Sequence, residues 1–210
     1  TQPSRPKIAM PPLAPDAWPL DPVWRTHLER LCAAFVDDAA STEQIRATAA
    51  ALPTRAADWL DALARRVLAA DYAELDAEQT AAWPFVAAAV QAVWTVAAAD
   101  QALGEQQPLA EVANVCPCCG SLPTASVIRL HPDVTNLRYL HCALCNTEWH
   151  YVRAKCTQCD DARQLTYRHV EGASEAVRAE ACGNCHSYLK VVHQDKDPHV
   201  DAIADDLATL

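Results

Sequence analysis

The residues of this sequence most able to do chemistry are eight cysteines arranged as four Cys-x-x-Cys pairs. The pairs are Cys116/Cys119, Cys142/Cys145, Cys156/Cys159 and Cys182/Cys185. A gap of 22 residues separates the first two pairs (120–141), and a gap of 22 separates the last two (160–181). Adding 40 to each of the first four cysteine numbers gives the last four, which indicates an internal repeat of one module.

Each pair can form a knuckle that directs both sulfur atoms to one side, and two knuckles together supply the four thiolates of a tetrahedral metal site. Zinc and a single iron ion both accept four thiolates. The equal gaps predict that one site uses the first two pairs and the other site uses the last two. A cross-braced pairing is the alternative that the spacing leaves open, although it would not explain two equal copies. Four thiolates leave no open coordination position, which predicts structural or one-electron redox centres rather than hydrolytic ones.

The residue after a knuckle often needs a left-handed backbone, which Gly and Asn tolerate best. Gly120, Asn146 and Asp160 follow the first three pairs, and Gly183 lies inside the fourth. These residues support four knuckles of similar geometry.

Other interpretations of the cysteines fit less well. Four disulfides are disfavoured by the regular spacing, and the chain shows no secretory signal. A thioredoxin-like role lacks a surrounding βαβ pattern. Cys118 falls outside the repeat register and is predicted to be a bystander thiol, and Cys32 is predicted to be a small core residue of a helix. Because each site already has four sulfur atoms, the nearby histidines are predicted to support the ligands or lie at the surface. These are His141, His150, His169, His186 and His193.

Both gaps contain a stretch of alternating apolar and polar residues, at 125–129 and at 164–169. Such stretches predict short antiparallel strands. Each module then reads knuckle, strand, turn, strand, knuckle, which is the plan of a rubredoxin or a zinc ribbon. We expect the first module at 113–153, the second at 154–195 and an acidic C-terminal tail at 196–210.

The first half of the chain predicts helices. Residues 1–20 contain six prolines and should run extended over the surface. An all-helical domain is expected over 21–112, beginning at an Asp21-Pro22 start signal. Within it, Ser41 or Thr42 is expected to cap a short helix.

A long helix is predicted from Asp76 to Gly104. Between Trp83 and Ala99 it is nearly all apolar, but alanine dominates and Gln91 interrupts it, so a buried bundle helix is favoured over membrane insertion. The predicted fold class is therefore α+β, with an N-terminal helical bundle followed by two tandem rubredoxin-like (zinc-ribbon-like) metal modules.

The charge is negative and unevenly distributed. The whole chain carries a net charge of −10, of which residues 1–115 carry −7, residues 116–196 carry +1 and residues 197–210 carry −4. This balance argues against non-specific nucleic-acid binding. The sequence contains no nucleophile-elbow, P-loop or dinucleotide fingerprint, and we do not expect an enzyme.

Several runs in the second half resemble the FdhE family of formate dehydrogenase accessory proteins. The residues that carry the resemblance are 116–123 (CPCCGSLP), 137–150 (LRYLHCALCNTEWH), 152–156 (VRAKC), 179–185 (AEACGNC), 188–190 (YLK) and 204–210 (ADDLATL). Cys118 departs from the usual first knuckle of the family. The helical half offers no sharp motif of its own.

The resemblance implies a cytoplasmic, chaperone-like bacterial protein that acts on the catalytic subunit of respiratory formate dehydrogenase before that subunit is exported. It also implies rubredoxin-like iron binding by the eight paired cysteines, as two mononuclear iron ions, with zinc as the alternative metal. The resemblance further implies that the first cysteine pair, Cys116/Cys119, affects the activity of the partner enzyme as well as metal binding. The competing function is a zinc-ribbon interaction or nucleic-acid-associated module without a redox role, which the acidic balance disfavours. Self-association is left open.

A partner-binding surface is expected near the second and third knuckles, because Arg, Tyr and Trp are enriched in binding hot spots. Its predicted members are Arg138, Tyr139, Trp149, Arg153 and Lys155. The alternative is that the aromatic residues pack the small module cores and that the charges are simply solvated.

Overall fold

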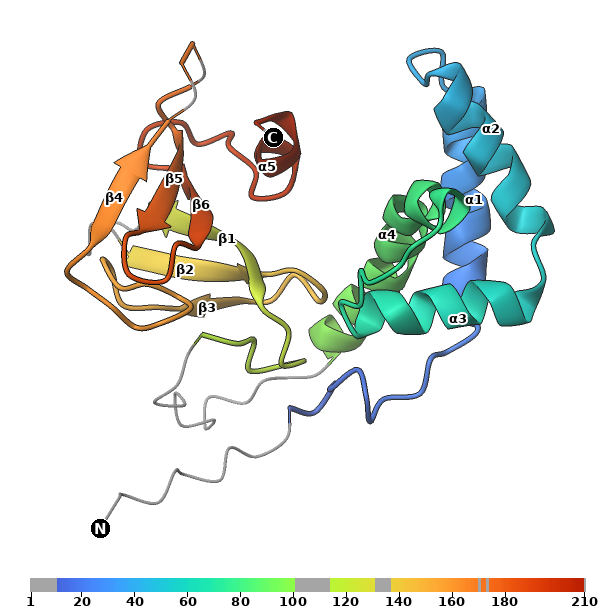
Figure 1. The fold of residues 1–210 in the computed structure, drawn as a ribbon, viewed down its shortest axis with the longest axis horizontal. Coiled ribbons are helices and arrows are strands. Elements are labelled where there is room, and N and C mark those ends of the chain that lie inside the picture. The colour runs from blue at the N-terminus through green and yellow to red at the C-terminus, as the bar shows by residue number, and fades with distance from the viewer. Residues whose placement is uncertain (1–10, 101–113, 131–136, 170, 173, 210) are drawn as a thin grey trace. The chain divides into compact units, whose positions relative to one another are not determined.

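The computed structural model of the protein describes residues 11–100, 114–130, 137–169, 171–172 and 174–209. These form two compact units (Figure 1), one of residues Pro12–Ala102 and one of Thr1–Pro11 with Leu103–Leu210. Three sequence-based expectations fall outside the described residues: the course of residues 1–10, the end of the long helix at Gly104 and the boundary at 112–113.

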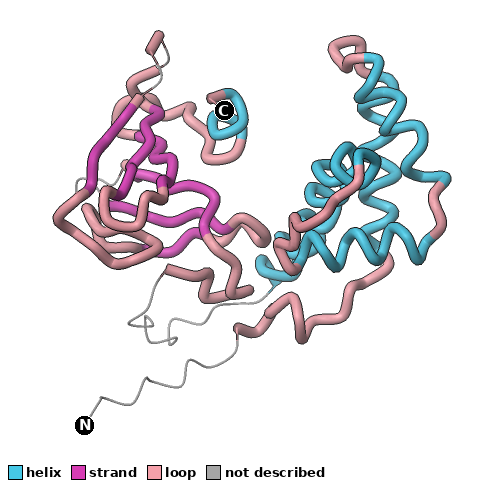
Figure 2. The backbone as a smooth tube through the Cα atoms, in the orientation of Figure 1, coloured by secondary structure: helices cyan, strands magenta, loops and turns pink. Residues whose placement is uncertain are grey.

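Helices make up the first unit, as Figure 2 shows. They are α1 (Val23–Asp37), α2 (Glu43–Ala51), the 3-10 turn η1 (Leu52–Thr54), α3 (Ala57–Leu68) and α4 (Ala77–Asp100). The Thr42 side chain accepts a hydrogen bond from the Ile45 N–H, as the predicted cap requires. At the start of α4, the Gln79 N–H donates to Asp76 Oδ1 (2.7 Å) and the Asp76 N–H donates to Gln79 Oε1 (3.2 Å), which forms a capping box.

The predicted start signal of α1 also has the expected geometry. Pro22 has helical dihedral angles, and Asp21 Oδ1 accepts a hydrogen bond of 2.9 Å from the Val23 N–H. Proline suits this position for two reasons. Its ring fixes φ near the helical value, and the N–H that it lacks would have no intrahelical acceptor in the first turn.

The long apolar helix α4 packs against α1 and α3. By length and composition alone it could cross a membrane. Part of its surface instead belongs to the core of the helical unit. Its buried residues are Ala82, Phe85, Val86, Ala89, Val90 and Trp94. Phe85 meets Phe35 of α1 edge to face, with ring centroids 5.3 Å apart.

The segment before α1 differs from the extended surface course that its prolines predicted. Leu13 is completely buried, and its carbonyl oxygen accepts a hydrogen bond of 3.0 Å from the indole N–H of Trp94. The Ala17 and Trp18 N–H groups both donate to the Ala14 carbonyl, which makes a turn. The cause is apolar burial, because Leu13 and Ala14 join the helical core despite the prolines around them.

A six-stranded sheet and a short helix form the second unit. The strands are β1 (Pro123–Arg129), β2 (Leu137–Cys142), β3 (Glu148–His150), β4 (Leu165–Arg168), β5 (Val177–Cys182) and β6 (Tyr188–His193), and the helix is α5 (Ala204–Ala208). Their order across the sheet is β3-β2-β1-β6-β5-β4, with β1 and β6 parallel and the other neighbours antiparallel.

The two modules therefore share one sheet, which the repeat did not predict. Each module contributes three neighbouring strands, and strands β2 (137–142) and β5 (177–182) match after the 40-residue shift. The first strand of one module pairs with the third strand of the other along Ala125–Ile128 and Lys190–His193. The modules are thus joined head to tail through backbone hydrogen bonds.

The C-terminal residues, expected as an acidic tail, contact the sheet in the structure. Val200 and Ala202 are buried in one cluster with Val127 and Val192 of the central strands. Lys190 Nζ lies 3.1 Å from Asp206 Oδ1 and donates to the Asp206 carbonyl. Apolar burial and this ion pair place the segment over one face of the sheet.

Candidate metal centres

The eight paired cysteines gather into two clusters of four. The members of the first are Cys116, Cys119, Cys142 and Cys145, and those of the second are Cys156, Cys159, Cys182 and Cys185. Within each cluster the sulfur atoms all lie within 4.8 Å of one another. The two knuckles of each cluster come from the same module, as the equal gaps predicted.

The spacing of the sulfur atoms suits a metal ion. The closest inter-knuckle distances are 3.5 and 3.4 Å in the first cluster and 3.6 and 3.6 Å in the second. Metal–sulfur bonds of about 2.3 Å at tetrahedral angles would separate the sulfur atoms by roughly 3.8 Å. A disulfide needs about 2.05 Å, and all of these cysteines are free thiols. The clusters can hold one ion each with little rearrangement.

All four knuckles repeat one backbone pattern. The N–H of each first cysteine donates to the carbonyl five residues later, with lengths of 2.9, 3.0, 2.9 and 2.9 Å. The residue after each second cysteine has a positive φ: Gly120 (79°), Asn146 (56°), Asp160 (61°) and His186 (60°).

The fourth knuckle differs from the others in the residue that follows it. No Gly or Asn follows its second cysteine, and His186 takes the left-handed conformation there. The knuckle geometry therefore dictates the backbone, even where the residue is neither Gly nor Asn. Gly183 instead approaches Gln164, where an added Cβ would lie 3.2 Å from the side-chain oxygen.

A hydroxyl group lies beside one thiol of each cluster. Thr147 Oγ1 is 3.1 Å from Cys145 Sγ, and Ser187 Oγ is 3.0 Å from Cys185 Sγ. These residues correspond after the 40-residue shift. The Ser187 side chain is the main cause that lowers the pKa of Cys185 to about 6, and hydrogen bonds from neighbouring thiols, Cys116 first, lower the pKa of Cys145. These contacts favour the thiolate form of Cys185 and Cys145, which is the form that binds a metal.

Cys118 and His141 lie beside the first cluster without joining it. Cys118 is completely buried, and burial raises the pKa of its thiol to about 11, so it stays protonated. His141 has Nδ1 3.2 Å from Glu148 Oε1 and Nε2 3.0 Å from Asn146 Oδ1, so both ring nitrogens are occupied. Cys118 is therefore a thiol outside the ligand set, and His141 contacts Asn146, which follows a cysteine of the cluster.

The two clusters differ in exposure, and this difference predicts different metal lability. All four cysteines of the first cluster are buried, whereas Cys159 and Cys185 of the second are partly exposed. Whichever metal is bound, we expect a chelator to remove it from the second cluster about tenfold faster, because solvent and chelator reach those sulfur atoms first. Timed alkylation mapped by mass spectrometry measures this within one molecule. Earlier alkylation of the first cluster would contradict the expectation.

The predicted partner-binding residues do not form one surface. Arg138 and Trp149 are buried, at 2% and 7% exposure. Tyr139 neighbours Arg138 on β2 and so points to the opposite face of the sheet. Lys155 is half-buried with Nζ 2.9 Å from Asp160 Oδ1, and Arg153 is exposed. Only Arg153 and Lys155 remain as a local basic pair.

Sequence reasoning missed the contact that holds Arg138. Its guanidinium lies 3.0 Å from Glu180 Oε1 of the second module. There was little indication of this buried ion pair in the sequence. Residues alternate between the two faces of β2, and the sequence alone does not show which face is exposed.

Comparisons with known proteins cover nearly the whole chain. Family models described as FdhE N-terminal, FdhE central domain and FdhE C-terminal domain match residues 4–111, 115–153 and 154–210. An FdhE homolog from Edwardsiella ictaluri is 40% identical over 200 residues, covering 95% of this chain and 63% of the relative. An FdhE homolog from Pasteurella multocida is 39% identical over 199 residues, covering 95% of this chain and 62% of the relative.

A solved structure extends the likeness to the fold. The crystal structure of the FdhE protein from Pseudomonas aeruginosa matches with a TM-score of 0.76 and 36% identity, covering 95% of this chain and 68% of that one. The chain spans about 63% of the length of the curated relatives named above. Because the three family models and this structure agree across both units, the chain belongs to the FdhE family.

Proposed function

We propose that the protein is a non-catalytic accessory factor for the maturation of respiratory formate dehydrogenase, and that it binds the catalytic subunit of that enzyme in the cytoplasm. The observation that carries the proposal is the pair of closed four-cysteine clusters in an FdhE-family chain. Four thiolates fill a tetrahedral ion, so no position remains for substrate. The clusters therefore suit folding, recognition or one-electron transfer.

The proposed ligands of the first ion are Cys116, Cys119, Cys142 and Cys145, and those of the second are Cys156, Cys159, Cys182 and Cys185. We propose mononuclear iron in both, with zinc as the second candidate, because thiolate sets accept either metal. Protein purified in air and analysed for metals decides between them. Two equivalents of iron with the red colour of a ferric tetrathiolate support the proposal, whereas two equivalents of zinc in a colourless protein favour a purely structural module.

Partner binding is tested with the local basic pair, of which Arg153 is exposed and Lys155 half-buried. Arg153→Ala with Lys155→Ala is expected to weaken capture of the formate dehydrogenase catalytic subunit by at least about tenfold, since hot-spot residues contribute about 2 kcal/mol or more. Arg163→Ala is the matched control, because its side chain is 87% exposed in the same unit. Tyr139→Ala tests the opposite face.

Metal content is measured in every variant before the capture experiment. Unchanged binding in the double variant would move the recognition site away from the basic pair. Failure of the wild-type protein to bind the catalytic subunit at all would overturn the proposed function itself.

A further inference from the structure

One face of the sheet carries a pocket at the seam between the two modules. Side chains alternate along a strand, so residues next to the buried Val127 and Val192 point away from the C-terminal segment. On that side the pairing register sets Ile128 beside His193 and Ser126 beside Val191. The pocket has a volume of about 270 Å³, with Ile128 and Val191 among its lining residues.

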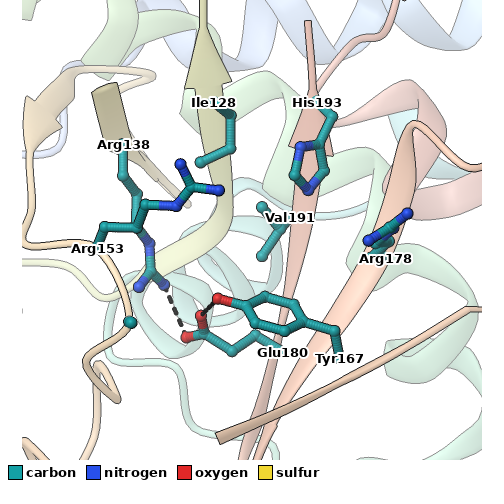
Figure 3. A pocket seen from close by; sticks show the side chains of 9 residues that line it. Ile128, Arg138, Arg153, Tyr167, Arg178, Glu180, Val191 and His193 are labelled. Carbon is teal, nitrogen blue, oxygen red and sulfur yellow. Dashed lines mark hydrogen bonds and ion pairs between the residues drawn. The ribbon is translucent and has the colours of Figure 1, made fainter. Parts of the chain in front are cut away.

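The pocket has an excess of positive charge. Figure 3 shows Arg153 pointing its guanidinium toward Ile128 at the edge of the pocket. Arg153 makes no hydrogen bond or ion pair within the described part of the chain. Arg178 borders the opposite side and pairs with Glu175, whose side chain is 81% exposed. The only carboxylate that lines the pocket among the described residues, Glu180, is already paired with Arg138.

A buried histidine nitrogen in the same pocket lacks a partner. His193 is 8% exposed, and its Nδ1 lies 3.2 Å from Asp195 Oδ1. Its Nε2 is buried without a hydrogen-bond partner among the described residues, and the ring borders the pocket in Figure 3. Buried polar atoms in native proteins are nearly always satisfied, so this nitrogen points to a ligand or to ordered water.

We propose that this pocket binds a carboxylate group, supplied either by a small free organic acid or by an acidic side chain of a polypeptide. A guanidinium such as that of Arg153 matches the planar fork of a carboxylate with two parallel hydrogen bonds. The apolar floor of Ile128 and Val191 suits the carbon atoms of an organic acid better than the fully polar surface of phosphate. The inference goes beyond the proposed function and does not depend on it.

Carboxylate binding should also be linked to a proton. Burial lowers the pKa of His193 despite the opposing effect of Asp195, and Lys196 and Arg178 lower it further, which favours the neutral ring. The charged groups around it are Asp195, Lys196, Arg178, Arg153, Arg138 and Glu180. A carboxylate opposite Nε2 raises the pKa of the ring, because the opposite charge favours imidazolium. Affinity should therefore fall as the pH rises through the pKa of the bound form.

The test uses the full, metal-loaded chain at fixed ionic strength. Acetate, succinate, N-acetyl-aspartate amide and phosphate are titrated separately while His193 and the Ile128 and Val191 methyl groups are followed by NMR. We expect saturable shifts of these groups with the carboxylates. Arg153→Gln should weaken binding by about tenfold. Arg163→Gln should leave binding unchanged, and His193→Gln should remove its pH dependence.

Each outcome decides the proposal. Tighter binding of N-acetyl-aspartate amide than of succinate assigns the carboxylate to a polypeptide, and the reverse assigns it to a free acid. Absence of saturable binding by any carboxylate would show a pocket filled with water only and would overturn the inference. Equal affinity for phosphate, or equal affinity in Arg153→Gln, would reduce the pocket to a general basic patch and would also overturn it. Arg153 also takes part in the capture experiment, so the two proposals are separated by His193→Gln, which should change the pH dependence of carboxylate binding and leave capture of the formate dehydrogenase subunit intact.

Discussion

Chelation of the proposed metals is expected to unfold the six-stranded sheet while α1–α4 stay folded. The apolar cluster on the sheet is built largely from Ala and Val, which is a small core for one unit. Structural tetrathiolate sites contribute about 10–16 kcal/mol of apparent binding free energy, so their loss exceeds what such a core can offset. The helical unit has no cysteine cluster among its described residues and has a separate core that includes Trp24, Leu63 and Trp94.

Circular dichroism and backbone NMR of the chelated protein measure this difference. Strand resonances should disappear while most of the helical signal remains. Loss of the helical signal together with the strands would contradict the division into two units.

Single-site variants refine the same experiment. Cys142→Ser and Cys182→Ser each remove one ligand from one cluster, and each should lower the metal content from two equivalents to one. Because β1 and β6 pair in parallel, either variant should also weaken protection of the neighbouring module. Cys118→Ser is the matched control, since this thiol is completely buried beside the first cluster but lies outside it. It should keep both equivalents.

Local features of this protein could be predicted from sequence. The knuckles depend on residues close together in the chain, so their spacing was enough to predict both clusters. The caps at Thr42 and Asp76 are equally local, because each acts within three residues. The repeat also predicted sequential pairing, since each cluster closes within one module.

Long-range features could not be predicted in the same way. Pairing of β1 with β6 joins segments more than 60 residues apart, and no turn or spacing encodes it. That pairing places the second module beside the first and so brings Glu180 within reach of Arg138. Leu13 was missed for a related reason, because its burial depends on a distant tryptophan, Trp94, while the local prolines indicate an exposed segment.

Arg138 and Glu180 form a buried ion pair across the seam. They lie on β2 and β5 of different modules, with β1 and β6 between them, and are only 2% and 4% exposed. Every part of the pair has a partner. Arg138 Nε donates to Ser126 Oγ (2.7 Å), its Nη1 donates to the Lys155 carbonyl (3.1 Å), and the Tyr167 hydroxyl donates to Glu180 Oε2 (2.9 Å).

Replacing one residue of this ion pair should therefore lower the free energy of unfolding far more than replacing both residues. Arg138→Met leaves the Glu180 carboxylate buried without its counter-ion and is expected to destabilise the sheet unit by about 3–5 kcal/mol. The double variant Arg138→Met/Glu180→Leu should recover most of this loss, because well-packed apolar residues can replace a buried pair. Arg129→Met is the matched control. Its pair with Glu148 is partly exposed, at 40% and 21%, and should contribute about 1 kcal/mol or less.

Urea unfolding of the metal-loaded protein, followed through strand amide resonances, gives the free energy of unfolding of each variant. The metal content is checked first, so that ligand loss does not enter the comparison. If Arg138→Met costs no more than Arg129→Met, the buried pair does not hold the modules together. If the double variant is as unstable as Arg138→Met alone, the cost lies in the lost contact of the guanidinium with the Tyr151 ring rather than in the unpaired carboxylate, since the guanidinium carbon lies 5.3 Å from the centre of that ring.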